Sequence, residues 1–138
     1  MISFNYENDF TLPNEEKISQ WISKVITSEN CKEQEINYVF CDDDYLHKLN
    51  VEFLNHDTLT DIISFDYSVG NNLQGDIFIS TERVADNAKD FGNSFQEELC
   101  RVIVHGILHY CGFKDKTETE VKEMRTKEDF YLNVLKVN

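Results

Sequence analysis

The sequence contains little proline, little glycine and no paired cysteines. One proline and five glycines among 138 residues leave no room for a flexible linker. The four cysteines lie far apart, without a Cys-x-x-Cys pair, and are expected to be reduced thiols. The chain has no apolar run near the ~18 residues of a membrane span and no signal-peptide pattern at its start. We therefore expect one cytoplasmic domain over residues 1–138, without a membrane partner.

Basic residues are also scarce, with 13 lysines and arginines against 26 acidic residues and a net charge of −13. A broad basic surface of the kind that holds duplex DNA is thereby excluded, so we expect no DNA partner. The deficit is uneven, because residues 1–94 carry a charge of −12 and residues 95–138 only −1. The net charge therefore does not exclude a local site for RNA in the near-neutral last third of the chain.

Hydrophobic periodicity and turn residues predict nine secondary-structure elements. In chain order these are a strand at 2–7, a helix from about Pro13 to 28, a strand at 35–41, a helix from Asp42 to about 54, a hairpin of strands 61–67 and 73–80, and helices at 81–91, 94–111 and 117–136. This order predicts an α+β fold with a small mixed sheet of about four strands. Helices are expected mainly on one side of the sheet, with a metal site on a central helix.

Capping signals fix the ends of the helix at 94–111. Ser94-Phe95-Gln96-Glu97 is a capping-box sequence, and Gly112 is placed to end the helix in a left-handed conformation. Thr117-Glu118-Thr119-Glu120 is a second capping box and predicts the start of the last helix. At about 100° per residue, the polar positions of the helix at 94–111 fall within an arc of roughly 80°. The rest of the helix is largely apolar, so this polar stripe should face solvent or a cleft.

Two histidines on that stripe are the strongest chemical signal. His105 and His109 are one turn apart and can share one Zn²⁺ ion, although two solvated histidines are the alternative. The continuation favours metal, because Gly112 allows the chain to double back and Asp115 follows three residues later. The spacing matches the elongated metzincin pattern with Asp in place of a third His. Three ligands leave a fourth position for water, as in catalytic zinc sites.

Gly106 argues against one class of metal enzyme. Zinc proteases of the His-Glu-x-x-His type carry their general base at this position, and glycine cannot serve as a base. Proteolysis by that mechanism is therefore disfavoured. A metal-dependent hydrolase of another substrate, peptidase-like enzymes included, stays open as an alternative.

Three separated motifs resemble one known family. The run His-Gly-Ile-Leu-His-Tyr-Cys-Gly-Phe at 105–113 is similar to the YbeY family, the bacterial metal-dependent endoribonucleases of ribosomal RNA maturation. Leu49-Asn50 to Phe53 with Thr60-Asp61-Ile62-Ile63-Ser64-Phe65, and Gly75-Asp76-Ile77, resemble two further stretches of that family. The resemblance spans most of residues 35–130 in the right order.

The resemblance implies a zinc-dependent endoribonuclease for single-stranded RNA, acting in maturation of the small-subunit rRNA 3′ end and in ribosome quality control. It further implies the ribosome or its small subunit as partner, and one Zn²⁺ per chain at His105, His109 and the residue at 115. Most members carry His where this chain has Asp115, a competent oxygen ligand. Leu54 replaces an arginine near the cleft, and Leu59 replaces a common proline. A non-enzymatic, zinc-stabilised ribosome-associated factor is the other alternative.

The catalytic groups beyond the metal are not identified by the motifs. The nucleophile could be the metal-bound water or the 2′-hydroxyl of the RNA. Glu98 and Asp61 are candidate bases only by polarity and motif membership. For Asp76, a role as a hydrogen-bond acceptor at a strand end is favoured.

Candidate RNA contacts are equally open. Arg101, Lys114 and Lys116 could bind phosphate, with ordinary solvated charge as the alternative. His47 and His56 have no assigned role, although His56 could line the cleft. Five aromatic residues could stack on bases, but core packing is the favoured interpretation. They are Phe53, Phe65, Tyr67, Tyr110 and Phe113.

Overall fold

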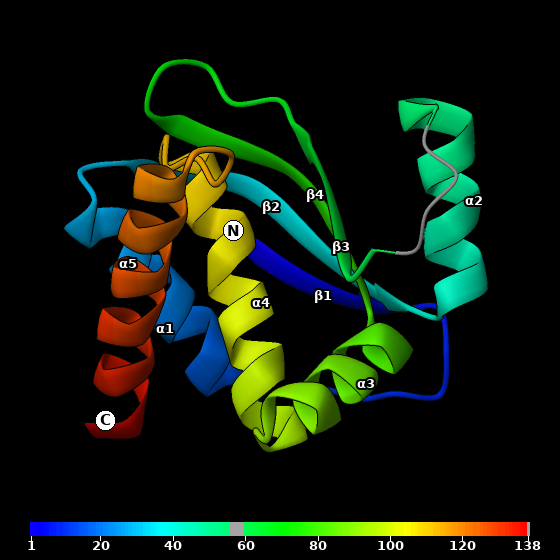
Figure 1. The fold of residues 1–138 in the computed structure, drawn as a ribbon. Coiled ribbons are helices and arrows are strands. Elements are labelled where there is room, and N and C mark those ends of the chain that lie inside the picture. The colour runs from blue at the N-terminus through cyan, green and yellow to red at the C-terminus, as the bar shows by residue number, and fades with distance from the viewer. Residues whose placement is uncertain (56–59, 138) are drawn as a thin grey trace.

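The computed structural model describes residues 1–55 and 60–137 of the chain. Within that part, five helices and a four-stranded mixed sheet form an α+β fold (Figure 1). In chain order the elements are β1 (Ile2–Tyr6), α1 (Glu15–Ser28), β2 (Lys32–Cys41), α2 (Asp43–Leu54), β3 (Ile62–Asp66), β4 (Asn72–Ser80), α3 (Thr81–Phe91), α4 (Phe95–Tyr110) and α5 (Glu118–Val137). The class and the order of elements expected from the sequence are confirmed. No helix of the described residues is long and apolar enough to cross a membrane.

Two boundaries differ from the prediction. Strand β2 begins at Lys32 rather than at 35, because its polar first residues pair with β4 from Lys32↔Asn72 onward. Pro13 lies outside α1, whose N-cap is Asn14 in the left-handed conformation, with φ of 61°. Both differences arise from backbone geometry, which hydrophobic periodicity does not encode.

The sheet has the strand order β1-β2-β4-β3. Strands β1, β2 and β4 are parallel neighbours, whereas β3 and β4 form the antiparallel hairpin expected from the sequence. Side chains of a strand alternate between the two faces of a sheet. On β4, Ile77 and Ile79 belong to the main core, while Phe78 packs with a second, smaller cluster around Cys41 and Leu46.

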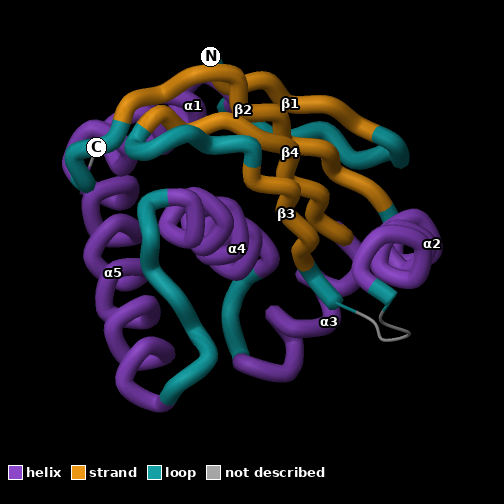
Figure 2. Tube along the Cα trace, turned by 90° about the horizontal axis from the view of Figure 1, so that it is seen from above, coloured by secondary structure: helices purple, strands orange, loops and turns teal. Residues whose placement is uncertain are grey.

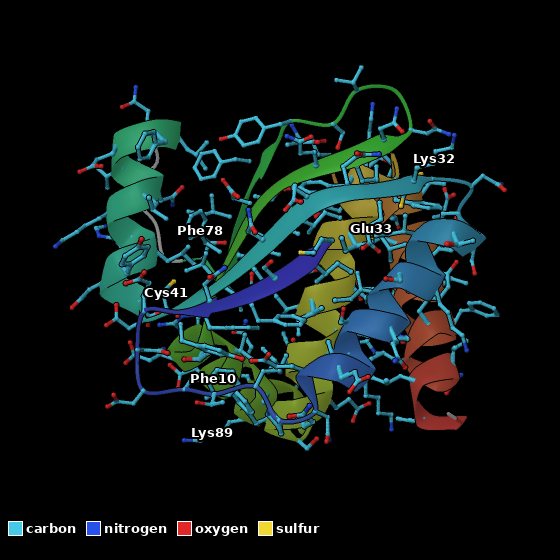
Figure 3. All side chains as sticks on the ribbon, turned by 180° about the vertical axis from the view of Figure 1, so that it is seen from behind. Phe10, Lys32, Glu33, Cys41, Phe78 and Lys89 are labelled. Carbon is cyan, nitrogen blue, oxygen red and sulfur yellow. The ribbon has the colours of Figure 1, made fainter. Side chains whose placement is uncertain are left out.

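The two faces of the sheet carry unequal numbers of helices. Residues of α1, α3, α4 and α5 pack into the main core, and α2 covers only the second cluster. Figure 2 shows α4 beneath the strands, with α5 on one side and α2 at the opposite end of the sheet. Cys41 and Phe78 lie on the part of the sheet nearest α2 (Figure 3). Helix α4 is therefore the central helix that the sequence predicted.

Packing holds α4 on three sides. Leu99, Ile103 and Ile107 are fully buried. Tyr38 of β2 donates a hydrogen bond from its hydroxyl to the Ile103 carbonyl at 2.9 Å. On the neighbouring helices, Trp21 Nε1 of α1 donates to a carbonyl of α5 at 2.8 Å. The polar stripe of α4 is thus presented by a rigid element.

The capping signals of α4 and α5 are realised to different extents. Ser94 Oγ accepts the Glu97 backbone N–H at 3.1 Å, while the Glu97 carboxylate lies 3.7 Å from Lys136 Nζ. At α5, both bonds of the box form, from the Thr117 N–H to Glu120 Oε1 and from the Glu120 N–H to Thr117 Oγ1. Both helix starts predicted from the sequence are confirmed.

Replacing Ser94 by alanine is expected to lower the free energy of unfolding by about 0.5–2 kcal/mol, because the Glu97 N–H loses its acceptor. Urea denaturation measures the effect. Ser94→Asp keeps an acceptor oxygen and should stay within a few tenths of a kcal/mol of the parent. Equal midpoints for Ser94→Ala and the parent would contradict a contribution from this cap.

Candidate metal centre

Three candidate ligand atoms converge at the end of α4. His105 and His109 project from α4, and Asp115 comes from the loop that follows it. The two Nε2 atoms are 2.9 Å apart, and Asp115 Oδ2 lies 3.2 Å from each. This group could hold a metal ion, as the spacing of the three residues in the sequence suggested.

A tight turn after α4 returns Asp115 to the histidines. Gly112 has a φ of 104°, in the region that favours glycine. Its N–H donates to the His109 carbonyl, and the Phe113 N–H donates to the Leu108 carbonyl, both at 3.0 Å. These two bonds form a Schellman motif, which reverses the chain within three residues. The predicted role of Gly112 is therefore confirmed.

The second nitrogen of each imidazole is already engaged. His105 Nδ1 lies 2.6 Å from Glu128 Oε2, and His109 Nδ1 lies 2.9 Å from the Phe113 carbonyl oxygen. An ionised carboxylate and a carbonyl can only accept, so both Nδ1 atoms carry the proton. Both Nε2 atoms then present lone pairs, 2.9 Å apart and next to a carboxylate oxygen. Such an arrangement is repulsive unless a metal ion lies among the three atoms or one Nε2 takes up a proton and donates it to its neighbour.

The donor set fits a small divalent metal. Two imidazole nitrogens and one carboxylate oxygen are the ligand types of catalytic zinc sites. Ligand atoms at the corners of a zinc tetrahedron are about 3.3 Å apart when the bonds are about 2.0–2.1 Å. The observed separations of 2.9, 3.2 and 3.2 Å are close to that value. Asp115 therefore occupies a place where a third ligand is needed.

Glu128 on α5 completes the site and was missed in the sequence. Its carboxylate, 6% exposed, accepts from His105 Nδ1 and from Arg101 Nη1 at 2.9 Å. Burial lowers the pKa of His105, but the hydrogen bond to Glu128 and the neighbouring carboxylates outweigh burial and raise it overall. A signal was present, because Glu128 stands four residues from both Met124 and Leu132 on the buried face of α5. A carboxylate on an apolar stripe indicates a partner.

The predicted cations are not equivalent. Arg101 lies beside the site, but its two terminal nitrogens bond Glu128 at 2.9 Å and Asp129 at 2.7 Å, so its charge is balanced. Lys114 borders a separate hollow on the other side of the loop, and Lys116 is exposed in that loop. Of the three predicted cations, only Arg101 lies beside the histidines, and its charge is already paired with Glu128 and Asp129.

A cavity of about 350 Å³ lies next to His105 and Asp115, between α4, α5 and the start of β3. Asp61 and Glu98, the two candidate bases, both line it. Burial raises the pKa of the Asp61 carboxyl, which the charge of His105 partly offsets. A carboxyl with a raised pKa in a cavity is a common mark of a functional site. The polar stripe of α4 therefore faces a cleft.

Other polar candidates have structural partners. Glu98 is buried and accepts from Asn93 Nδ2 at 3.2 Å. Asp76 does not line the cavity and accepts from Asn37 Nδ2 at 3.0 Å; it is the expected acceptor, but it lies in the interior of β4 rather than at a strand end, because β4 runs from Asn72 to Ser80. A Cβ at Gly106 would lie 3.1 Å from Ile62 Cδ1, so position 106 serves close packing against the sheet.

Three of the five aromatic candidates, Phe65, Tyr110 and Phe113, pack in or against the core, whereas Phe53 is 62% exposed. Tyr110 is buried and donates from its hydroxyl to the Phe65 carbonyl at 2.9 Å. Phe65 packs edge-on against Phe53 at 5.8 Å between ring centroids, and Lys127 Nζ lies 5.3 Å from the Phe113 ring centroid.

The remaining candidates lie elsewhere in the chain. Tyr67 is exposed. His47 and Leu54 belong to α2, and no described residue of α2 lines the cavity, so position 54 is not beside it as the resemblance implied. His56 and Leu59 lie outside the described residues.

Comparisons with known proteins agree with the motifs. A family model described as "Endoribonuclease YbeY" matches residues 3–136. A protein of that name from Flavobacterium johnsoniae is 67% identical over 129 residues, covering 94% of this chain and 93% of the relative. Another from Flavobacterium psychrophilum is 58% identical over 137 residues, covering 99% and 98%. The solution structure of TM1509 from Thermotoga maritima has a TM-score of 0.71 and 25% identity, covering 98% of this chain and 89% of that one.

Proposed function

The chain belongs to the YbeY endoribonuclease family, and we propose that it is a metal-dependent endoribonuclease that cleaves single-stranded RNA during ribosomal RNA maturation. Zn²⁺, one per chain, is the proposed metal, and His105, His109 and Asp115 are its proposed ligands. We propose that it acts in the cytoplasm, with the ribosome or its small subunit as partner. Its proposed roles are maturation of the small-subunit rRNA 3′ end and ribosome quality control. Residues 1–138 would form a single domain.

The observation that carries the proposal is the pair of imidazole lone pairs. Glu128 and the Phe113 carbonyl hold the Nδ1 protons, which leaves both Nε2 atoms facing each other at 2.9 Å with Asp115 beside them. Hydrogen bonds to the second nitrogen of metal-binding histidines fix their tautomer and orientation. The ligands are therefore preorganised for a cation, and an open cavity lies next to them.

A divalent metal at this site supplies polarisation of a phosphoryl oxygen and a lowered pKa of bound water. The cavity supplies Asp61, which we assign as the proton acceptor for the attacking water or for the RNA 2′-hydroxyl. Its raised pKa brings a carboxylate closer to the range in which a general base works well. Both carboxylates accept from an asparagine, Asp61 from Asn87 at 3.4 Å and Glu98 from Asn93 at 3.2 Å. Glu98 is the less suitable base because it is buried, whereas Asp61 is partly exposed.

Cleavage of a labelled single-stranded RNA tests the proposal. Purified protein should cut the single strand in preference to the matching duplex, lose activity in a chelator and regain it when Zn²⁺ is restored. His109→Ala, purified in parallel, should be inactive because one of three ligands is missing. Cleavage that survives the chelator or His109→Ala would reveal a contaminating nuclease. Absence of cleavage with any divalent metal would favour the non-enzymatic factor, and hydrolysis of a peptide instead would favour the peptidase-like alternative.

A further inference from the structure

The cavity beside the histidines has an unusual charge balance for an RNA-binding site. Its lining includes four carboxylates and two guanidinium groups. These are Asp61, Glu98, Asp115, Glu128, Arg101 and Arg125. A phosphodiester strand carries one negative charge per nucleotide, so an acidic lining repels it. Besides the proposed metal, whose charge offsets part of this lining, an arginine or lysine that is not already neutralised would favour substrate binding there.

Arg101 does not meet that requirement. Its guanidinium group bonds the carboxylates of Glu128 and Asp129, and its side chain is only 11% exposed. A phosphate at Arg101 would compete with these two carboxylates for its charge, and Glu128 also bonds His105. Arg101 therefore holds α5 against α4 rather than offering a free charge.

Arg125 on α5 differs from Arg101 in its exposure and in its lack of ion-pair partners among the described residues. It is exposed, and no ion pair or hydrogen bond of its side chain is found within residues 1–55 and 60–137. Val121, Met124, Arg125 and Glu128 share one face of α5, at the helical spacing of zero, three, four and seven residues, and all four line the cavity. Met124 and Glu128 are buried, so they fix the rotation of α5 and keep Arg125 at the cavity.

We propose that Arg125 binds a phosphate of the RNA strand in the cavity, beside the group formed by His105, His109 and Asp115. This inference rests on the proposed function. A guanidinium group presents a planar fork of N–H donors that matches two phosphate oxygens.

The same helix offers a matched control. Lys122 is exposed on α5, one turn before Arg125. Lys122→Gln and Arg125→Gln remove the same charge from the same helix, so the two variants have equal net charge. A difference between them reports on position rather than on overall electrostatics.

Binding of a fluorescein-labelled 12-nucleotide single-stranded RNA, followed by anisotropy in EDTA at several KCl concentrations, tests the contact. Arg125→Gln should weaken binding about tenfold at low salt, as expected for one charge-assisted hydrogen-bond pair. It should also reduce the steepness of the salt dependence by about 0.7, the value for one phosphate contact on a single strand. Lys122→Gln should change the affinity less than threefold. Arg125→Lys should fall between the parent and Arg125→Gln.

Cleavage with Zn²⁺ restored gives a second measurement, which decides the question where binding in EDTA is below detection. Arg125→Gln should raise KM about tenfold with kcat within threefold, because the contact holds the strand and not the reacting atoms. If Arg125→Gln and Lys122→Gln behave alike while the parent cleaves RNA in a His109-dependent manner, this inference is wrong and the proposed function stands. If the parent neither binds nor cleaves RNA, both are wrong.

Discussion

Replacing Glu128 by glutamine is expected to weaken divalent-metal binding about tenfold, and replacing it by alanine about a hundredfold. The carboxylate accepts the Nδ1 proton of His105 at 2.6 Å, which leaves the Nε2 lone pair for the metal. Its negative charge also makes the imidazole a stronger base and a better ligand. Glutamine can still accept the proton through its carbonyl oxygen but lacks the charge, whereas alanine loses both.

Competition between the protein and a zinc-sensitive dye gives the metal dissociation constants. Asp129→Asn is the matched control, because Asp129 also bonds Arg101, whereas the carboxylate that bonds His105 is that of Glu128. Both substitutions remove one carboxylate from Arg101, but the Glu128 side chain is 6% exposed and the Asp129 side chain 56%, so the Glu128 variants should lower the stability of the metal-free protein more. Only the Glu128 variants should lose metal affinity. Equal metal affinities for Glu128→Gln and Asp129→Asn would contradict the role assigned to Glu128.

The parts of the site that the sequence predicts are those that depend on local spacing. His105 and His109 are one helical turn apart, and Gly112 reverses the chain so that Asp115 follows within six residues of His109. The caps at Ser94 and at Thr117 are also local, because each involves residues three positions apart. Such features follow from helix geometry alone, so one sequence was sufficient to predict them.

The parts that escaped prediction depend on packing between distant elements. Glu128 meets His105 across 23 residues of chain, and this contact exists only because α5 lies along α4 (Figure 1). The same packing pairs Arg101 with carboxylates and, among the described residues, leaves Arg125 free at the cavity. A charge count gives the number of cations near a motif but not which of them remains unpaired. The net charge of −13 therefore excludes a broad basic surface without identifying the local cation.

Gly75 shows how one position can serve both the fold and the site. The Gly-Asp-Ile motif places it on β4, facing the last residue of α4. Tyr110 donates from its hydroxyl to the Phe65 carbonyl at 2.9 Å, which ties the end of α4 to the β3–β4 hairpin. A Cβ on Gly75 would lie 2.2 Å from that carbonyl oxygen and 2.4 Å from the Tyr110 hydroxyl. Only glycine at position 75 leaves space for the bond between the Tyr110 hydroxyl and the Phe65 carbonyl. Tyr110 directly follows His109 in the sequence.

Gly75→Ala is therefore expected to lower the free energy of unfolding by about 3 kcal/mol, from overpacking and the disturbed hydrogen bond. For a chain of this length the melting temperature should fall by about 10 °C. Tyr110→Phe removes only the hydroxyl and should cost about 1 kcal/mol. Because removal of the hydroxyl relieves one of the three approaches shorter than 3.0 Å, Gly75→Ala should cost less in the Tyr110→Phe background than alone.

Thermal denaturation of the parent, the two single variants and the double variant measures this coupling. The two losses should sum to more than the loss in the double variant, because both substitutions act on the same contact between β4 and the end of α4. Strict additivity, or a loss below about 0.5 kcal/mol for Gly75→Ala, would show that the hairpin moves away from α4 at little cost. In that case Tyr110 does not hold in place the end of α4 that carries the proposed metal ligands.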